Sequence, residues 1–388
     1  MSNIPKVRFK GFTDDWEQCK VLDIAPLQRG FDLPTSQMEN GDYPVVMSNG
    51  IGGYHNEYKV KGPGVVTGRS GTIGKVHYIE SDYWPHNTSL WVTDFKGNEP
   101  KFIYHLYQWL DLSKFGTGSG VPTLNRNDVH DSKVFIPSVG EQRKISEYFD
   151  RLDNLITLHQ RKCEAIKKYK TGVLQKMFPR DGEKTPEIRF PGFTDAWEQR
   201  KLSDFGKATG GTSIESEFSE DGIYKVISIG SYSEDSVYRD QGIRAIESDK
   251  TKNRVLNKDD LTMILNDKTA SGNIIGRALL IEESGVYVYN QRTERIEIDH
   301  DNYDSLFLYE MLNAPSIRDK IIKQSQGNTQ IYVNWPTISM TEYLVPKIEE
   351  QRKLGAYFKN LDNLITLHQR KCDFMKELKK GLFQQMFV

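Results

Sequence analysis

Two long stretches of this chain carry apolar or semi-apolar residues at intervals that alternate between four and three. The first runs from Ile145 to Met177 and the second from Leu354 to Met386, and neither contains proline. This alternation is typical of the seam of a coiled coil. Each stretch therefore predicts one helix of ~33 residues, which is ~50 Å long at 1.5 Å per residue. Because a lone helix with such a stripe would expose too much apolar surface, we expect the two helices to pair.

The central part of the two predicted helices has the same sequence. Residues 152–163 read LDNLITLHQRKC, and residues 361–372 read the same. A second block repeats nearly as well, since VRFKGFTDDWEQ at 7–18 returns as IRFPGFTDAWEQ at 188–199. The chain is therefore built from two units in tandem.

The region between the two helices is long enough to bring the chain back, which favours antiparallel packing. Antiparallel pairing of identical sequences creates a pseudo-twofold axis. The seam also contains polar residues, which weaken a coiled-coil core but help to fix its register: His159, His368, Lys170 and Lys379.

Short runs rich in Val, Ile and Tyr, punctuated by glycine, precede each predicted helix and indicate strands. A helical pattern appears once in each half, at 101–109 and at 303–313. We expect a mixed α/β domain with a strongly curved sheet and long loops, present twice. The strand-like runs lie at 43–49, 64–79 and 88–95 in the first half and at 224–230, 261–266, 274–283 and 286–291 in the second.

The predicted fold class is therefore α/β (α+β), with two mixed domains joined by two long antiparallel coiled-coil helices in a pseudo-twofold tandem repeat. We place the first domain at 1–140 and the first long helix at 141–180. The second domain is placed at 181–348 and the second long helix at 349–388. Two domains of about this size are large enough to bury their own cores.

The spacing between equivalent positions shows where the halves differ. It is 181 residues at the opening block, 202 at Gly74 and Gly276, and 209 along the long helices. The second half therefore carries an insertion near 231–253, and the material between framework positions is almost unrelated. Two recognition modules with different targets would differ in this way.

Composition and charge describe a globular protein that works with partners. The chain has 388 residues, of which 37% are hydrophobic and 27% charged, and it shows no signal peptide and no apolar run long enough to span a membrane. Its three cysteines form no CxxC pair, which favours a reducing cytoplasm.

A net charge of −1 is low for a protein that holds DNA alone. Positive charge is concentrated at the helix ends, since 161–180 has seven basic residues and one acid. If nucleic acid is the ligand, partners should supply part of the phosphate contact.

Three pairs of polar loops are the candidate binding sites. They are GRSGTIGK (68–75) with NDKTASGN (266–273), WPHNTS (84–89) with VYNQRT (288–293), and GTGSGVPTLNR (116–126) with SQGNTQIYVNW (325–335). Side chains of these types reach base edges and phosphates, although each loop taken alone is equally consistent with an ordinary solvated turn. The strongest candidates are Arg69, His86, Asn87, Lys268, Asn273, Gln291 and Arg292, and the others are Ser70, Thr72, Lys75, Thr117, Ser119, Arg126, Ser271, Asn328 and Gln330.

The motifs of common active sites are missing. GRSGTIGKV is not a phosphate-binding P-loop, because Arg69 stands where that loop needs glycine and Val76 where it needs Ser or Thr. GTGSG is not a dinucleotide fingerprint, the histidines form no HExxH, and no Asn/Asp-Pro-Pro-aromatic tetrad of an amino-methyltransferase occurs. We therefore predict no catalytic residues and no metal site in this chain.

A second apolar stripe flanks the helix seam and makes the apolar face wider than a two-stranded coiled coil needs. It either packs against the protein's own domains or docks helices of a partner, and the sequence leaves both readings open. The stripe consists of Tyr148, Leu155 and Leu158, with Tyr357, Leu364 and Leu367 in the second copy.

This arrangement resembles the specificity subunit of bacterial type I restriction–modification systems over essentially the whole chain. The residues that carry the resemblance are the RFxGFTDxWEQ openings, the GTIGK and NIIGR turns (71–75 and 273–277), and the EQRK entries into LDNLITLHQRK. Each motif is weak alone, but their order in tandem is specific.

The resemblance implies a DNA-binding, non-catalytic subunit in which each domain is a target-recognition domain that reads one half of a bipartite double-stranded sequence. The helices would act as a spacer, and a ~50 Å rod limits the distance between the halves to ~15 base pairs. The same helices would dock two adenine methyltransferase (modification) subunits and the restriction/motor subunits. AdoMet, Mg²⁺ and ATP would bind those partners and not this chain, and the flipped adenine would enter the methyltransferase pocket.

Two other functions remain compatible with the residues. One is a tandem-domain scaffold, built on the coiled coil, whose domains bind protein. The other is a duplicated enzyme with an unrecognised site in each domain, which would require the two sets of loops to share their polar residues. Apart from Asn87/Asn290 and Asn125/Asn334, these loops differ.

Overall fold

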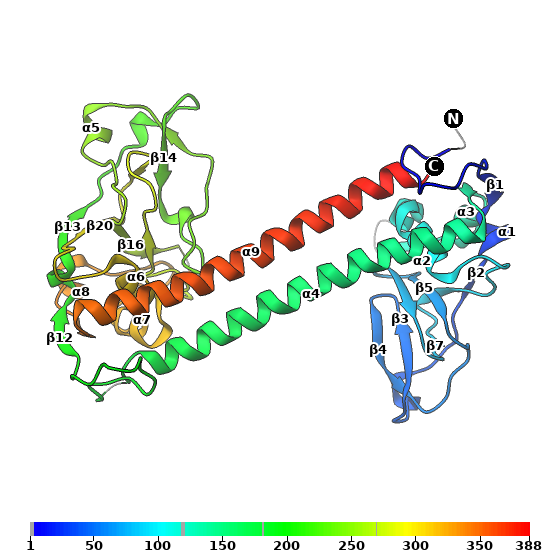
Figure 1. Ribbon diagram of the computed structural model, residues 1–388, viewed down its shortest axis with the longest axis horizontal. Coiled ribbons are helices and arrows are strands. Elements are labelled where there is room, and N and C mark those ends of the chain that lie inside the picture. Colours follow the sequence, from blue (N-terminus) through cyan, green and yellow to red (C-terminus); the bar gives the residue numbers. More distant parts are fainter. Residues whose placement is uncertain (1–3, 118–120, 181, 269) are drawn as a thin grey trace. The chain divides into compact units, whose positions relative to one another are not determined.

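The computed structural model describes residues 4–117, 121–180, 182–268 and 270–388. The chain divides into two compact units, each of which combines one globular domain with parts of both long helices (Figure 1). Unit 1 contains Met1–Arg161 and Gln369–Val388, and unit 2 contains Lys162–His368. Each unit therefore draws its helices from two distant parts of the sequence.

In the part of unit 1 that the structure describes, the domain contains four small sheets, one of which is the pair of β9 with β10. Strand β1 (Glu17–Lys20) pairs with β11 (Lys133–Ile136). A four-stranded sheet has the order β2-β8-β5-β6, and a three-stranded sheet has the order β4-β3-β7. The bounds are β2 (Leu27–Arg29), β3 (Tyr43–Met47), β4 (Gly50–His55), β5 (Gly64–Gly68), β6 (Val76–Ile79), β7 (Trp84–Pro85), β8 (Ser89–Val92), β9 (Gly116–Thr117), β10 (Thr123–Leu124), α1 (Val21–Ile24), α2 (Pro100–Leu110) and α3 (Arg126–His130).

The domain of unit 2 repeats this plan strand by strand. Strand β12 (Glu198–Lys201) pairs with β22 (Glu342–Val345), the four-stranded order is β13-β20-β16-β18, and the three-stranded order is β15-β14-β19. The bounds are β13 (Gly206–Gly210), β14 (Tyr224–Ile227), β15 (Arg244–Ala245), β16 (Leu261–Ile264), β17 (Asn266–Asp267), β18 (Ala278–Leu280), β19 (Tyr287–Tyr289), β20 (Thr293–Ile298), β21 (Ile331–Tyr332), α5 (Asp249–Lys252), α6 (Ser305–Asn313), α7 (Pro315–Ile322) and α8 (Trp335–Ile338). The prediction of a mixed domain present twice is confirmed.

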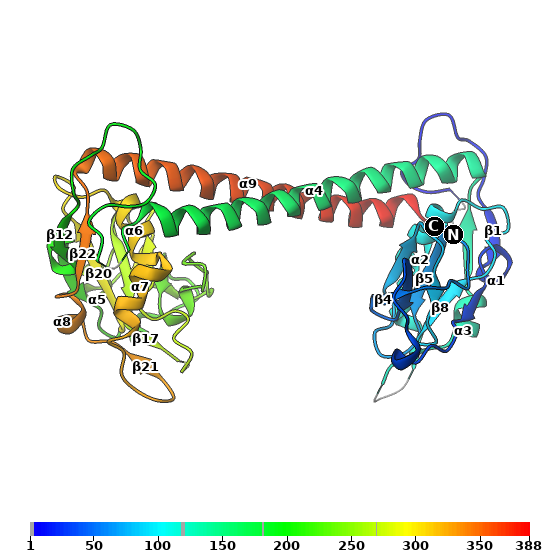
Figure 2. The ribbon, with the colours of Figure 1, turned by 90° about the horizontal axis from the view of Figure 1, so that it is seen from below.

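The long helices are α4 (Val139–Met177) and α9 (Ile348–Met386), and each has 39 residues. The predicted length of ~33 residues was too short, because the apolar seam begins only after the first turn of each helix. In unit 1, Phe149 stacks on Phe383 at 4.4 Å, and Lys379 Nζ lies 2.7 Å from Asp153 Oδ1. Increasing residue numbers on α4 thus pair with decreasing residue numbers on α9, so the two helices run antiparallel in this unit. Figures 1 and 2 both show them side by side there.

Unit 2 contains the equivalent contacts with the roles of the helices exchanged. Phe178 of α4 stacks on Phe358 of α9, and Lys170 Nζ lies 2.7 Å from Asp362 Oδ1. The prediction of antiparallel pairing is therefore confirmed within each unit. The seam lysines set the register, because each meets an aspartate of the repeated LDNL sequence across the helix pair.

The repeated sequence motifs fasten each domain to the helix that follows it. Arg8 donates two hydrogen bonds of 2.8 Å to the buried carboxylate of Glu141, and Arg189 does the same to Glu350 at 2.7 Å. The neighbouring glutamine accepts a hydrogen bond from the backbone N–H at the start of the packed helix, as Gln142 does from Glu99. The motifs that repeat between the halves are therefore structural.

The end of each long helix completes a domain core. In unit 1, Phe387 packs edge-on to Trp16 and stacks on Phe102 at 5.6 Å. In unit 2, Phe178 packs edge-on to Trp197 and lies 5.8 Å from Phe307. The first domain is thus completed by the helix that follows the second domain, and the second domain by the helix that follows the first.

The sequence prediction missed several elements. Helix α7 was not expected, and neither were β20, the short strand pairs β1–β11 and β12–β22, or the edge strands β2 and β13. Within the part of the chain that the structure describes, none of the helices is both long and apolar enough to cross a bilayer.

Candidate nucleic-acid interface

In unit 1 the three predicted loops meet at one end of the four-stranded sheet. The N–H groups of Arg69 and Ser70 donate to the carbonyl of Thr88 at 2.9 and 3.2 Å. The carbonyl of Arg69 accepts from the N–H of Leu124 at 2.7 Å, and Ser70 bridges to Thr123. Loops far apart in sequence are therefore fixed to one another by their backbones.

The side chains of this loop cluster vary in how firmly they are held. His86 Nδ1 lies 2.9 Å from the hydroxyl of Thr88, and the amide of Asn87 donates to Asp32. Both side chains are half-buried. Of the other predicted residues, Arg69, Ser70 and Thr72 are half-buried, Lys75, Thr117 and Arg126 are exposed, and Ser119 lies outside the described residues.

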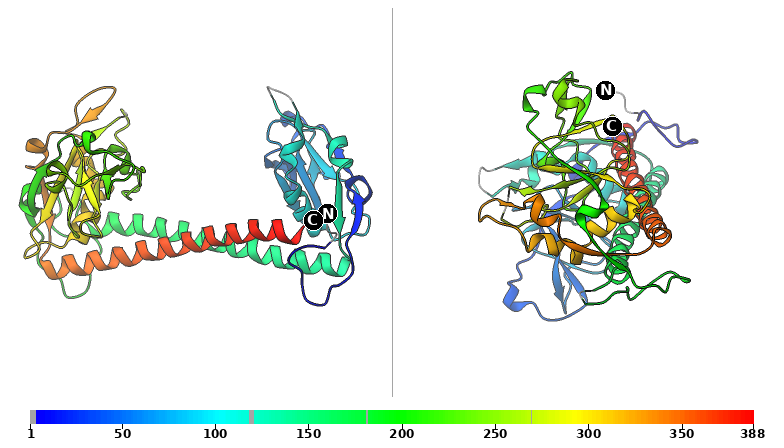
Figure 3. Two further views of the ribbon diagram at one scale, coloured as in Figure 1. Left: turned by 90° about the horizontal axis from the view of Figure 1, so that it is seen from above. Right: turned by 90° about the vertical axis from the view of Figure 1, so that its left-hand side faces the viewer.

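Unit 2 joins its equivalent loops in the same way. The N–H of Leu265 donates to the carbonyl of Arg292 at 2.9 Å, while the carbonyl of Leu265 accepts from Val333. Strand β17 pairs with β21, which brings the 266–273 loop beside the 326–332 segment. In Figures 2 and 3 this β17–β21 pair lies at the end of the domain remote from α9, where it is drawn in yellow and orange.

The predicted side chains of unit 2 are all exposed. Asn273 donates to Glu234 at 2.9 Å and Gln291 to Glu215 at 3.3 Å, so both amides already have an acidic neighbour. Arg292 has φ +69°, a left-handed conformation that is uncommon for residues other than glycine and is often found at binding sites. The remaining exposed candidates are Lys268, Ser271, Asn328 and Gln330.

One glycine in each unit, Gly30 or Gly211, allows the backbones of neighbouring loops to approach closely. Neither glycine was among the predicted site residues. A Cβ atom on Gly30 would lie 2.2 Å from the carbonyl oxygen of His86, and one on Gly211 would lie 2.1 Å from that of Asn290. Gly30 and Gly211 are separated by the same 181 residues as the opening blocks. That spacing was the signal that could have placed both glycines at equivalent sites.

Beside Gly30, Arg29 and Asp32 also belong to the cluster. Arg29 Nη2 lies 3.0 Å from Asp32 Oδ1, the same oxygen that receives the amide of Asn87. A carboxylate held between an arginine and an amide fixes both side chains at the edge of the loops. Nothing in the sequence pattern marked these residues, because they meet Asn87 only through the fold.

In unit 2 the corresponding turn is held by Arg254, which comes from just beyond the insertion. Its guanidinium donates to the carbonyl of Gly210 at 2.7 Å, to the hydroxyl of Tyr289 at 3.0 Å and to the hydroxyl of Thr212 at 3.0 Å. The nearby carboxylate of Glu294 is buried, and this desolvation raises its pKa to about 7. The two domains therefore use different chemistry beneath equivalent loops.

Shared asparagines of the loops prove to be structural in unit 2. Asn290 is buried and accepts a hydrogen bond from the N–H of Ile214. Asn125 and Asn334 both stand at the N-cap position of a short helix. In unit 2 the shared asparagine Asn290 thus belongs to the framework, while the candidate side chains that differ between the halves are exposed.

The flanking stripe on the helices is partly covered by the domains. Phe9 packs edge-on to Tyr148 at 5.8 Å, and Phe190 packs edge-on to Tyr357 at 5.7 Å. The four leucines differ from these tyrosines, since Leu155, Leu158, Leu364 and Leu367 are 40, 44, 43 and 45% exposed. Packing against the protein's own domains therefore accounts for the two tyrosines, and docking of a partner stays a prediction for the four leucines.

Cations gather where the long helix enters the domain of unit 1. A cleft of about 820 Å³ is lined by Lys114 from the domain and by Lys376, Lys379 and Lys380 from α9. Of these, Lys379 pairs with Asp153 and Lys114 with Asp111, which leaves Lys376 and Lys380 facing the cleft. In the described part of the chain, no group of three His, Cys, Asp or Glu side chains is arranged to hold a metal ion.

Comparison with known protein families identifies the family of this chain. Residues 13–168 and 194–373 each match the family described as type I restriction modification DNA specificity domain. The chain belongs to this family. Each match covers one domain and most of the long helix that follows it.

Individual relatives agree with this assignment. The chain is 24% identical to the type I restriction enzyme MjaVIII specificity subunit of Methanocaldococcus jannaschii over 70% of its own length and 65% of that protein. It is 26% identical to the EcoprrI specificity subunit of Escherichia coli over 29% of its own length and 28% of that protein. The matched part thus spans less than two thirds of either relative.

The fold is also that of a solved specificity subunit. The crystal structure of the type I restriction–modification S subunit from M. genitalium superposes with a TM-score of 0.70 and covers 99% of both chains. Sequence identity is 13%, so the likeness is one of fold. The tandem arrangement of two domains with long helices is therefore shared with that S subunit.

Proposed function

We propose that this specificity subunit reads a bipartite sequence in double-stranded DNA, with one recognition domain on each half. The observation that carries the proposal is the convergence of three polar loops at one end of each sheet. Exposed Arg, Lys, Asn and Gln side chains at such a position match the donors and acceptors of the major groove, and a good bidentate contact discriminates a base by ~1–3 kcal/mol. The different side chains in the two clusters imply different half-sites.

The long helices would serve as the spacer and as the docking surface for partners. Two methyltransferase subunits would bind the exposed leucines, one in each unit, because Leu155 with Leu158 and Leu364 with Leu367 offer the same apolar pair twice. The restriction/motor subunits would join that complex. AdoMet, Mg²⁺ and ATP would be bound by these partners, and this chain would contribute recognition without chemistry of its own.

A net charge of −1 supports the need for partners. DNA affinity depends strongly on phosphate neutralisation, and the cations of this chain are local, at the helix ends and in the loops. Partners that complete a clamp would supply the remaining contacts. The chain alone should bind DNA weakly and lose that binding steeply as salt rises.

The deciding experiment is to co-express this chain with the adenine methyltransferase subunit encoded beside it and to map methylated adenines in the host DNA. The proposal requires a single bipartite motif with a fixed gap. In the same complex, Arg69→Ala should change methylation through the first half of the motif and Arg292→Ala through the second half. A stable complex that methylates nothing would favour the alternative, a tandem-domain scaffold that binds protein through its domains.

A matched pair of variants tests the spacer. Inserting one turn of helix, four residues, into both α4 and α9 should keep both half-sites and lengthen the gap between them. Inserting the same residues into the exposed segment 239–242 of the second domain should leave the gap unchanged. If the gap stays constant in both variants, the helices do not set it.

A further inference from the structure

Helices α2 and α6 occupy equivalent places in their units, yet they meet the long helices through different contacts. Each starts beside a repeated glutamine, Gln142 or Gln351, which accepts from the backbone N–H of Glu99 or Asp304. We call the surface that receives α2, made of 139–161 and 369–386, the first socket. The surface that receives α6, made of 162–177 and 348–368, is the second socket.

The first difference between the sockets is steric. Gly355 of α9 lies directly under the start of α6, and a Cβ there would come within 2.8 Å of Leu306 Cβ and 2.9 Å of the backbone nitrogen of Phe307. Backbone atoms of a packed helix cannot move aside cheaply. The equivalent residue of the first socket is Ser146, whose buried hydroxyl donates to the carbonyl of Gln142 at 2.8 Å. Helix α6 therefore needs a glycine that the first socket does not have.

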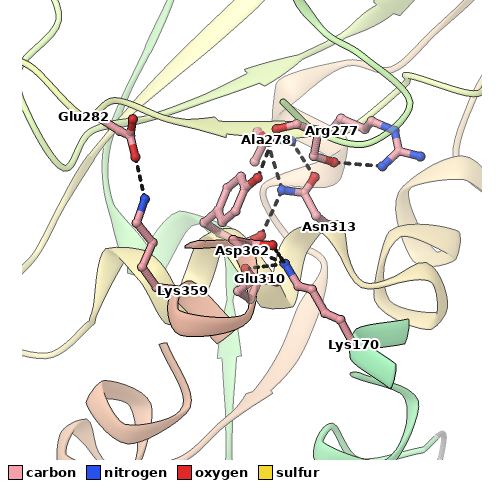
Figure 4. A network of polar contacts seen from close by, with 10 residues as sticks. Lys170, Arg277, Ala278, Glu282, Glu310, Asn313, Lys359 and Asp362 are labelled. Carbon is pink, nitrogen blue, oxygen red and sulfur yellow. Dashed lines mark hydrogen bonds and ion pairs between the residues drawn. The ribbon is translucent and has the colours of Figure 1, made fainter. Parts of the chain in front are cut away.

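The second difference is one of charge. In unit 1, Asp150 of the long helix receives Lys101 at 2.6 Å and His105 at 3.3 Å, both from α2. In unit 2 the residue equivalent to Asp150 is Lys359, which pairs with Glu282 of the domain. The residue equivalent to His105 is Glu310, whose carboxylate is buried against Lys170 (Figure 4). The second domain thus presents Glu282 where the first socket has Asp150, whereas Glu310 would still meet a cation there, because Lys379 is equivalent to Lys170.

We propose that the first socket accepts only domains of the first type and rejects the second domain. Placed there, α6 would meet the Cβ of Ser146, and Glu282 would face Asp150 in place of Lys359. The reverse exchange is milder because it avoids the steric conflict, since the second socket has a glycine at 355. Its charge conflict, Lys101 opposite Lys359, is of the same exposed kind, and such pairs contribute little. Exchange of domains between the two positions is therefore easier in one direction. This inference concerns assembly and holds whether or not the domains read DNA.

A full-length chain with the second domain in both positions tests the proposal. Residues 188–347 replace residues 7–138, and the thermal unfolding midpoint is compared with that of the parent. The midpoint should fall by roughly 5–10 °C for a conflict of this kind. Adding Ser146→Gly with Asp150→Lys should raise the midpoint of this chimera and lower that of the parent, which loses the Lys101 and His105 contacts. An unchanged midpoint in the chimera, or a pair of substitutions that acts with the same sign in both chains, would overturn the proposal.

A point variant covers the case in which the chimera does not fold. Helix propensity alone predicts that Gly355→Ser stabilises a helix, since serine is the better helix former. The socket predicts a midpoint lower by at least about 5 °C. Gly381→Ser in the same helix is the matched control, because nothing lies within 4 Å of its Cβ position, and its midpoint should rise. If Gly355→Ser behaves like Gly381→Ser, α6 does not need the glycine and the proposal fails.

Discussion

Lys170 Nζ lies 2.8 Å from Glu310 Oε1, and the same ammonium also contacts Asp362 at 2.7 Å. One cation is therefore shared between two carboxylates at the junction of α4, α6 and α9. Burial of Glu310 raises its pKa to about 8, and the neighbouring charge of Asp362 adds to that rise while Lys170 opposes it. Because Asp362 already balances Lys170, a protonated Glu310 gives the cluster a net charge of zero.

This cluster predicts that the protein loses stability as pH rises from about 4.5 to about 8. A glutamate titrates near 4.3 in an unfolded chain and near 8 here, so the folded state binds the extra proton between these values. The free energy of unfolding should fall as pH rises from about 4.5 to 8 and level off above. Glu310→Gln, which keeps the neutral form at every pH, should flatten this part of the profile. Denaturant titrations between pH 5 and 9 on both chains provide the measurement, and parallel profiles would contradict the assignment.

The buried ion pairs of the opening motif predict a large and specific loss of stability. Arg8→Ala leaves the carboxylate of Glu141, which is 1% exposed, without its partner. Removing one member of a buried pair costs ~3–5 kcal/mol. The double variant Arg8→Ala with Glu141→Gln should recover much of that loss, because no buried charge then remains. Urea unfolding of the four chains of this cycle measures the coupling, and additive losses would show that the pair does not interact.

The close approach at Gly30 and Gly211 predicts that alanine at either position disturbs one loop cluster. A methyl group 2.1–2.2 Å from a backbone carbonyl forces the turn and its neighbouring loop apart. Gly30→Ala should change methylation through one half of the target and Gly211→Ala through the other. Gly172→Ala, in α4 with open space around it, is the control and should stabilise the chain by about 1 kcal/mol. Equal damage to both halves by either variant would argue against separate reading sites.

The two proposed docking faces are unequal, and this predicts unequal binding of two partner copies. Phe374 is 67% exposed on α9 in unit 1, and the equivalent residue of the repeat in unit 2 is Ala165. Exposed aromatic residues contribute strongly to interfaces. Phe374→Ala should weaken one of two methyltransferase copies, and Ala165→Phe should strengthen the other. Native mass spectrometry of the complex at falling concentration would measure the fraction of this chain that carries a single methyltransferase subunit, and that fraction should change in both variants. If both methyltransferase subunits dissociate together in every variant, the prediction is wrong.

Local patterns were enough to predict the framework of the fold. The alternation of four and three found α4 and α9, and the spacing of the repeats found the tandem domains. The pairing of Asp153 with Lys379 and of Asp362 with Lys170 explains why polar residues interrupt the seam, and the sequence already indicated that they fix the register.

The candidate site was only partly accessible to sequence reasoning. The three loops could be named because glycine and polar residues mark turns, but Arg29, Asp32 and Arg254 join them through contacts that no local pattern encodes. Asn290 shows how neighbours in one loop can differ, since its side chain turns inward to accept a hydrogen bond from Ile214 although Gln291 and Arg292 beside it are exposed. Whether a polar side chain serves the framework or the surface depends on the tertiary neighbours that it meets.

The aromatic ends of the long helices have a consequence for synthesis on the ribosome. Trp16 and Phe102 emerge early, but the ring that closes over them, Phe387, is translated only after the entire second domain. The core of the first domain therefore lacks this ring while the second domain is synthesised. The second domain differs, because Phe178, which packs on Trp197, has been synthesised before it. A chain that stops anywhere before Phe387 leaves its first domain unfinished. Premature termination near the C-terminus should therefore destabilise the domain at the N-terminus. Proteases and chaperones could then act on that incompletely folded domain.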